Sequence, residues 1–190
     1  PGKNYLASEW NIKKFTNNRF QNIKLNEEAK PIFSDKIYSV TDRNFDNPKI
    51  LEEKTLLIFE NNLSFEISDF NNQKFKKIIL ISNKNENRAI VLSENVMKFK
   101  SQLIEDQKKR LEEKSINCEI IDLTEIQNIN EDTYGLYPTV GENLDYINLN
   151  KLKIEFLYRK LDQFSWQYCN KGFFNFKNYI PKIIANFNFL

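Results

Sequence analysis

The sequence predicts an α/β fold: a small, mainly parallel sheet with flanking helices, preceded by an irregular docking arm and followed by an aromatic helical tail. Two runs, 55–59 and 77–82, are almost entirely apolar, as is typical of strands buried on both faces. The segment 94–114 between later strands has the spacing of an amphipathic helix. A hydrophobic content of 41% in 190 residues is enough for a sizeable core.

The first fifty residues are predicted to be irregular. They contain many asparagines, and Pro31 and Pro48 interrupt them. Such a long stretch without elements is unusual inside a compact domain. Its apolar residues could anchor the arm on another surface: Ile32, Phe33, Ile37, Tyr38 and Val40. The alternative is a disordered leader.

Six segments are candidate strands of the sheet. The first two are 55–59 and 77–82, and a shorter candidate covers 88–92. The others are 117–121, 134–137, which Pro138 ends, and 154–158. Strands separated by helical stretches imply right-handed crossovers and a mainly parallel sheet.

The helix is predicted from Glu94 to about Lys114, with Ser93 as its N-cap. Opposite charges four residues apart, Glu105–Lys109 and Asp106–Arg110, favour it on the solvated side. The face expected to pack on the sheet consists of Val96, Phe99, Leu103, Gln107 and Leu111.

The tail, 161–190, is aromatic and predicted to be helical. Gly172 breaks it, and Pro181 can open a final helical turn. The predicted organisation is therefore an arm (1–50), an α/β domain (51–160) and a tail (161–190).

Composition excludes several kinds of chemistry. The chain has no histidine, which rules out Ser-His-Asp and Cys-His nucleophile systems and His-based zinc sites. Cys118 and Cys169 form no C-x-x-C pair, so we expect two buried thiols in a reducing compartment, with a disulfide as the alternative. No apolar run approaches the ~18 residues that span a bilayer, and no secretory signal is visible. These features predict a cytoplasmic protein without a membrane partner.

The sequence contains no phosphate-binding loop. Its four glycines form neither G-x-G-x-x-G nor G-x-x-x-x-G-K-[ST]. Polar residues nevertheless follow the first strand, where open α/β sheets place ligands: Glu60, Asn61 and Asn62. Glu142 and Asp145 are expected near the same rim. These carboxylates could bind a metal or act as acid and base, or be ordinary loop residues and helix caps.

One segment near the start points to a family. Lys3-Asn-Tyr-Leu-Ala-Ser-Glu-Trp-Asn-Ile-Lys-Lys-Phe-Thr16 resembles a stretch, roughly K-Y-L-x-x-Q-x-N-I-N-K-Y-T, of bacterial FAD-binding proteins of the DNA photolyase/cryptochrome superfamily. In those proteins it follows the helical lobe that wraps the flavin. The resemblance implies that this chain is the C-terminal portion of such a flavoprotein, that FAD is bound mainly by a lobe outside this chain, and that this lobe is its partner. Tyr5, Trp10 and Asn11 would lie near that lobe.

Two further segments resemble the same family. Phe164-Ser-Trp-Gln-Tyr-Cys-Asn-Lys-Gly-Phe-Phe-Asn-Phe-Lys177 is similar to its aromatic C-termini. Leu136-Tyr-Pro-Thr-Val-Gly-Glu-Asn143 is similar to a turn that precedes the tail, although Tyr137 stands where a basic residue or histidine is expected. The implied activity is light-driven electron transfer, which in DNA-repairing members splits a pyrimidine dimer flipped out of the duplex. No catalytic residue of the family falls within this chain.

The tail also interleaves aromatic and basic residues, which can stack and neutralise single-stranded nucleic acid. The candidate DNA-binding residues are Arg159, Lys160, Trp166, Lys171 and Lys177. The alternative is an aromatic core under a solvated lysine fringe. Trp10 and Trp166 are candidates for electron transfer or for packing. The second functional hypothesis is a stand-alone, non-catalytic α/β module that recognises nucleic acid or a protein.

Overall fold

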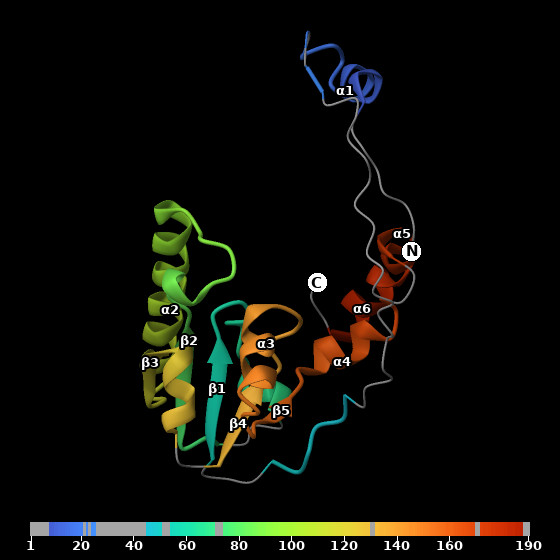
Figure 1. Cartoon of the computed structure of the whole chain (residues 1–190). Coiled ribbons are helices and arrows are strands. Elements are labelled where there is room, and N and C mark those ends of the chain that lie inside the picture. The colour runs from blue at the N-terminus through green and yellow to red at the C-terminus, as the bar shows by residue number, and fades with distance from the viewer. Residues whose placement is uncertain are drawn as a thin grey trace. The chain divides into compact units, whose positions relative to one another are not determined.

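A computed structural model describes residues 8–20, 22, 24–25, 45–50, 54–70, 74–129, 132–169 and 172–187 (Figure 1). The chain divides into two compact units, Pro1–Arg43 and Asn44–Leu190. Each unit is considered by itself.

In the first unit the structure contains a short helix, α1 (Glu9–Phe15), where an irregular arm was predicted. The prediction was wrong here because local signals outweigh the many asparagines. The Ser8 hydroxyl accepts a hydrogen bond from the Asn11 N–H (3.2 Å), and Glu9 pairs with Lys13 (2.6 Å). Asn17 then takes a positive φ of 50° just after the helix ends.

The second unit is built on a five-stranded sheet in which every pair is parallel, in the order β3-β2-β1-β4-β5 (Figure 1). The strands are β1 (Thr55–Phe59), β2 (Lys77–Ser82), β3 (Cys118–Asp122), β4 (Thr133–Leu136) and β5 (Glu155–Leu157). The predicted α/β fold with a parallel sheet is thus confirmed. The central strand β1 is buried along its whole length, as its apolar run indicates.

The candidate strand at 88–92 is wrong, because these residues form a loop between β2 and α2. Asn85 closes this loop on itself: its side chain donates to the Leu92 carbonyl (2.7 Å) and accepts from the Leu92 N–H (2.8 Å). Ile90 and Val91 are 73% and 76% exposed. The apolar run Ala89–Leu92 therefore looks like a strand in sequence but does not pair.

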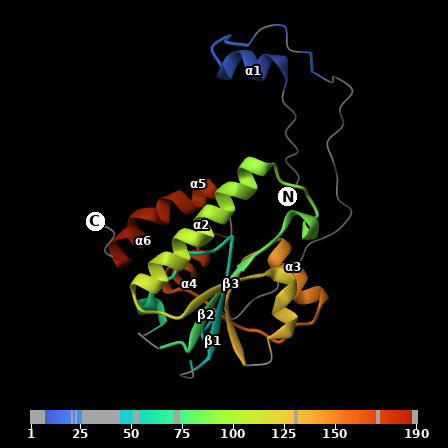
Figure 2. The same ribbon diagram turned by 90° about the vertical axis from the view of Figure 1, so that its left-hand side faces the viewer.

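Helices cover the sheet on both faces, as Figure 2 shows with α2 and α3 on opposite sides. One face packs beneath α2 (Glu94–Glu113). The other packs beneath the 3₁₀ segment η3 (Leu123–Asn128) and α3 (Glu142–Leu149). Alternate residues of β1 serve the two cores, with Leu56 and Ile58 on the α2 side and Leu57 and Phe59 on the other.

The extent of α2 agrees with the prediction, but its buried face does not. Ser93 occupies the N-cap position without a side-chain cap bond. The residues buried against the sheet are Ile104 and Leu111, with Met97 and Lys100 half-buried on the same stripe. The expected contact residues Val96, Phe99 and Leu103 are 43%, 59% and 42% exposed. The predicted face and the buried face are offset by one residue in sequence and share Leu111. Helical spacing fits both, and the predicted face is the more apolar, so spacing alone selects the face that is not buried.

The described residues of the connection from β1 to β2, 60–70 and 74–76, form no α-helix. A 3₁₀ turn, η1 (Ile67–Phe70), stands in its place, and three phenylalanines cover the sheet. Phe70 lies 5.8 Å from Phe65 and 6.0 Å from Phe75 between ring centroids. Large aromatic side chains thus supply the apolar area that a crossover helix would supply.

The tail is helical, as predicted: α4 (Lys160–Trp166), α5 (Phe173–Phe176), η4 (Lys177–Tyr179) and α6 (Ile180–Phe187). Gly172 precedes α5 with a φ of 80°, and Pro181 is the second residue of α6.

Residues 45–50, the last of the predicted arm, lie against the sheet in the second unit. The Asn47 side chain exchanges two hydrogen bonds with the Tyr158 backbone (2.8 and 2.6 Å). The Tyr134 hydroxyl donates to the Lys49 carbonyl (3.3 Å), and Ile50 packs on the core. Residues 45–50 are therefore held against the sheet by both hydrogen bonds and apolar packing. The rest of the predicted arm, apart from α1 and the few residues after it, lies outside the described residues.

Both cysteines are free. Cys118 is buried, and burial raises the pKa of its thiol to about 11, which keeps it protonated and unreactive. Cys169 is exposed, contrary to the expectation of two buried thiols, because it follows α4 at the surface. Among the described helices, none has the length and apolarity to span a bilayer.

Phe70→Ala is expected to lower the free energy of unfolding by about 3–5 kcal/mol, because it opens a cavity under a fully buried ring. Urea unfolding followed by circular dichroism measures the change. The control Phe99→Ala removes a ring that is 59% exposed on α2 and is expected to change the value by less than about 0.5 kcal/mol. Equal effects of the two substitutions would contradict the core described here.

Candidate functional site

The strand order places a topological switch point between β1 and β4. The chain crosses from β1 toward β2 on the α2 side, whereas it leaves β4 toward β5 on the α3 side. In open parallel sheets the crevice beyond the carboxyl ends of two such strands is the usual ligand site. Here Glu60–Asn62 follow β1, and 137–143 follow β4. The candidate site is therefore this edge of the sheet.

A buried arginine occupies the crevice. Arg88, from the loop before α2, donates from Nη2 to Glu60 Oε1 (2.5 Å) and from Nη1 to Glu142 Oε2 (2.9 Å). Its Nη2 also donates to the Asn83 carbonyl (2.6 Å). The side chains of Arg88 and Glu60 are only 4% and 6% exposed. A second cation, Lys100 of α2, lies 3.0 Å from the same Glu60 oxygen.

Asparagine side chains join the loops that follow β1 and β4. Asn61 donates to the Pro138 carbonyl (2.6 Å) and accepts from the side chain of Asn143 (2.9 Å). Asn62 donates to the Tyr137 carbonyl (2.9 Å). Tyr137, which stands where the family resemblance led us to expect a basic residue or histidine, thus contributes its backbone to this edge.

Asp122, the last residue of β3, holds the residues that precede Arg88 in the loop between β2 and α2. It accepts hydrogen bonds from the Lys84 N–H (3.2 Å) and the Asn87 side chain (3.1 Å). The Thr124 N–H and hydroxyl also donate to it (3.0 and 2.6 Å). Burial by itself would raise the pKa of Asp122, but the hydrogen bonds from Thr124 and Lys84 outweigh it and hold the pKa below its usual value.

Three buried polar atoms at this edge have no hydrogen-bond partner: Asn83 Oδ1, Arg88 Nε and Asn143 Oδ1. Asn83 is 1% exposed and Asn143 is 5% exposed. The amide nitrogen of Asn83 lies 3.4 Å from Glu142 Oε2, so its unpaired oxygen belongs to the arginine cluster. The buried hydrogen-bond network around Arg88 is therefore only partly satisfied.

The prediction that Glu60, Asn61, Asn62 and Glu142 share one rim is confirmed. Asp145 is exposed on α3 and is not among the residues that contact Arg88. The two carboxylates are ion-paired with a guanidinium, and among the residues that the structure describes no group of three acids or cysteines could hold a metal ion.

Sequence reasoning missed Arg88, Lys100 and Asn83. Arg88 borders the apolar run Ala89–Leu92 and was assigned to a strand, whereas a lone arginine next to a polar loop is the signal that could have identified it. Lys100 lies on the half-buried stripe of α2 that the chosen helix face excluded.

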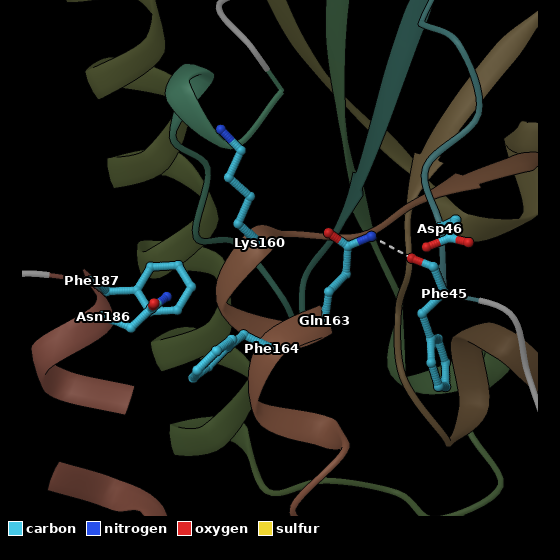
Figure 3. Close-up of a pocket in the computed structure, with 7 residues that line it drawn as sticks. All are labelled: Phe45, Asp46, Lys160, Gln163, Phe164, Asn186 and Phe187. Carbon is cyan, nitrogen blue, oxygen red and sulfur yellow. Dashed lines mark hydrogen bonds between the residues drawn. The ribbon is translucent and has the colours of Figure 1, made fainter. Parts of the chain in front are cut away.

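A second, more open groove of about 850 Å³ lies between α4, α6 and residues 45–46. Figure 3 shows the rings of Phe164 and Phe187 side by side at one end, and Phe45 at the other. Gln163 donates to the Phe45 carbonyl across its middle (Figure 3). The seven residues that line this groove are Phe45, Asp46, Lys160, Gln163, Phe164, Asn186 and Phe187.

The candidate nucleic-acid residues lie in different environments. Trp166 is half-buried and packs against Phe45 (4.9 Å) and Tyr137 (5.8 Å). Arg159 pairs with Asp162 (2.8 Å), with its side chain 16% exposed, and also donates to Ser64 O (3.3 Å). Lys160 and Lys177 are exposed, and Lys177 lies over the ring of Phe174 (5.3 Å). Lys171 lies outside the described residues.

The candidate cofactor residues belong to the first unit. Trp10 is 65% exposed, with the Lys14 ammonium 4.6 Å from its ring centroid. Asn11 is half-buried and donates its N–H to the Ser8 cap. Tyr5 lies outside the described residues. Their predicted place beside a flavin-binding lobe stays a prediction.

Comparison of the chain with models of protein families, with curated proteins and with solved structures finds no match.

Arg88→Met is expected to lower the free energy of unfolding by about 3–5 kcal/mol, since it leaves the buried Glu60 carboxylate without its main partner. Arg110→Met is the matched control. Arg110 pairs with Asp106 at 2.9 Å, but the two side chains are 68% and 56% exposed, so the loss should not exceed about 1 kcal/mol. Chemical denaturation measures the free energy of unfolding of both variants. Equal losses would contradict the conclusion that Arg88 stabilises the fold more than the exposed Arg110 does.

Asp122→Asn is expected to lower the free energy of unfolding by about 1.5–3 kcal/mol at pH 7, because ionised Asp122 accepts four hydrogen bonds. Since the folded pKa of Asp122 is lowered, its contribution is complete above the ordinary carboxyl pKa near ~4 and is lost as the pH falls through the folded value. The difference between wild type and Asp122→Asn should therefore shrink in urea titrations as the pH falls below the ordinary carboxyl pKa of ~4. A difference that grows on acidification would contradict the hydrogen-bond assignment.

Proposed function

We propose that this chain is the C-terminal part of a photolyase/cryptochrome-like FAD flavoprotein, and that it assembles with a helical flavin-binding lobe outside these residues. The single observation that supports the proposal most is the position of the four most exposed aromatic side chains among the described residues. Trp10 and Phe15 of α1 are 65% and 74% exposed, and Phe173 and Phe174 of α5 are 66% and 78% exposed. All four lie in two of the three segments that resemble the family, 3–16 and 164–177.

Exposed aromatic rings of this size are typical of surfaces that another polypeptide covers. The α5 rings are 5.9 Å apart and have a lysine beside them. α1 presents Trp10 and Phe15 with Lys14 between them. Both surfaces thus combine exposed aromatic area with a lysine held against the rings.

In this proposal the chain is not the catalytic part. FAD is held by the helical lobe, and light moves an electron to or from that flavin, with splitting of a pyrimidine dimer as the reaction in a DNA-repairing protein. The described residues provide the scaffold. The carboxylates at the edge of the sheet are engaged by Arg88 and Lys100, which suits a structural role for that edge. The assembly is expected in the cytoplasm.

The test is isolation of the tagged chain from its own cells with everything that copurifies, followed by an absorption spectrum. Flavin bands are expected in the wild-type sample. Trp10→Ser/Phe15→Ser and Phe173→Ser/Phe174→Ser should each reduce the copurified flavin at least tenfold, because two rings that bury on assembly contribute about 1.5–3 kcal/mol each.

The matched control is Ile90→Ser/Val91→Ser, which removes two apolar residues that are equally exposed but lie outside the resembling segments. It should leave the flavin content unchanged. A wild-type sample without flavin and without a copurifying polypeptide would sink the proposal, and so would equal losses in all three double variants.

A further inference from the structure

We propose that the crevice between β1 and β4 is a binding site for a guanidinium-bearing ligand, and that Arg88 occupies it as an internal competitor. The proposal does not depend on the assignment to a flavoprotein. It rests on the geometry around Arg88 and on the three unpaired polar atoms beside it.

The site has the features of a guanidinium receptor. Glu60, following β1, and Glu142, opening α3, approach one guanidinium from two sides (2.5 and 2.9 Å), and the Asn83 carbonyl accepts a third bond. A planar fork of N–H donors fits such an arrangement better than the point charge of an ammonium. Without Arg88 the cluster would hold two carboxylates and the single ammonium of Lys100, a net negative charge that attracts a cation.

Arg88 satisfies this receptor incompletely. Its Nε has no acceptor, and the buried oxygens of Asn83 and Asn143 have no donor. The side chain enters from its own loop, so the tether restricts how its donors can turn. A free guanidinium compound carries the same donors without that restriction. The unpaired oxygen of Asn83, a residue only 1% exposed whose amide contacts Glu142, is the group that such a ligand could reach.

Apart from those of Arg88 itself, the hydrogen bonds of the loop lie on either side of residues 88–91, so Arg88 can leave the crevice while the rest of the loop stays in place. On one side Lys84 and Asn87 are fixed to Asp122, and on the other Leu92 is bonded to Asn85 of the same loop. Between them Ile90 and Val91 are 73% and 76% exposed. The guanidinium is thus the main anchor of 88–91 to the sheet, and a competitor would release that short segment without disturbing β2 or α2.

The experiment uses the full chain with methylguanidinium, and with methylurea as the neutral probe of similar shape. In Arg88→Ala, millimolar methylguanidinium should raise the melting temperature saturably, and methylurea should not. Glu60→Gln in the Arg88→Ala background should weaken this binding at least tenfold. Glu113→Gln, a change at an exposed residue near the far end of α2, should leave it unchanged.

Wild type provides an independent measurement if Arg88→Ala does not fold. Methylguanidinium should increase hydrogen exchange of the 88–91 amides, with methylurea and equal ionic strength as controls. A folded Arg88→Ala that responds alike to both probes, or that binds undiminished after Glu60→Gln, overturns the proposal. If Arg88→Ala is unfolded, unchanged exchange in wild type overturns it.

Discussion

The buried ion pair of Arg88 with Glu60 is the interaction on which the carboxyl edge of this domain depends. A guanidinium that is only 4% exposed is tolerated only where carboxylates and carbonyls surround it. That requirement draws together three segments distant in sequence: the end of β1, the start of α3 and the loop before α2. The asparagines at 61, 62 and 143 then join the loops around it.

This arrangement decides what the α/β framework can do. A doubly wound sheet opens a crevice where its strand order reverses, yet here a side chain of the same polypeptide lies in that crevice. The two glutamates that could serve as metal ligands or as an acid and base instead neutralise a cation. While Arg88 lies in the crevice, the surfaces available for recognition include the exposed apolar ones on α1, on α5 and along α2.

The remainder of the domain follows from the burial of the parallel sheet on both faces. Since β1 and β2 have apolar residues on both sides, each face needs a cover. Two helices and a 3₁₀ segment supply most of it, and the phenylalanines at 65, 70 and 75 cover the sheet beside the β1–β2 connection. Three of the many aromatic residues in the sequence thus have a specific role, which is to cover one face of the sheet.

The sequence by itself determined the parallel sheet, the extent of α2 and the helical tail, because apolar runs, helical periodicity, glycine and proline act over a few neighbouring residues. It also placed Glu60 and Glu142 on one rim, since carboxyl ends of parallel strands share an edge. Only the tertiary structure decided which stripe of α2 is buried, that Ala89–Leu92 stays unpaired, and that Arg88 lies between the two glutamates. The place of Arg88 depends on contacts between residues 28 and 54 positions apart, and local spacing contains no information on the charge or shape of such distant partners.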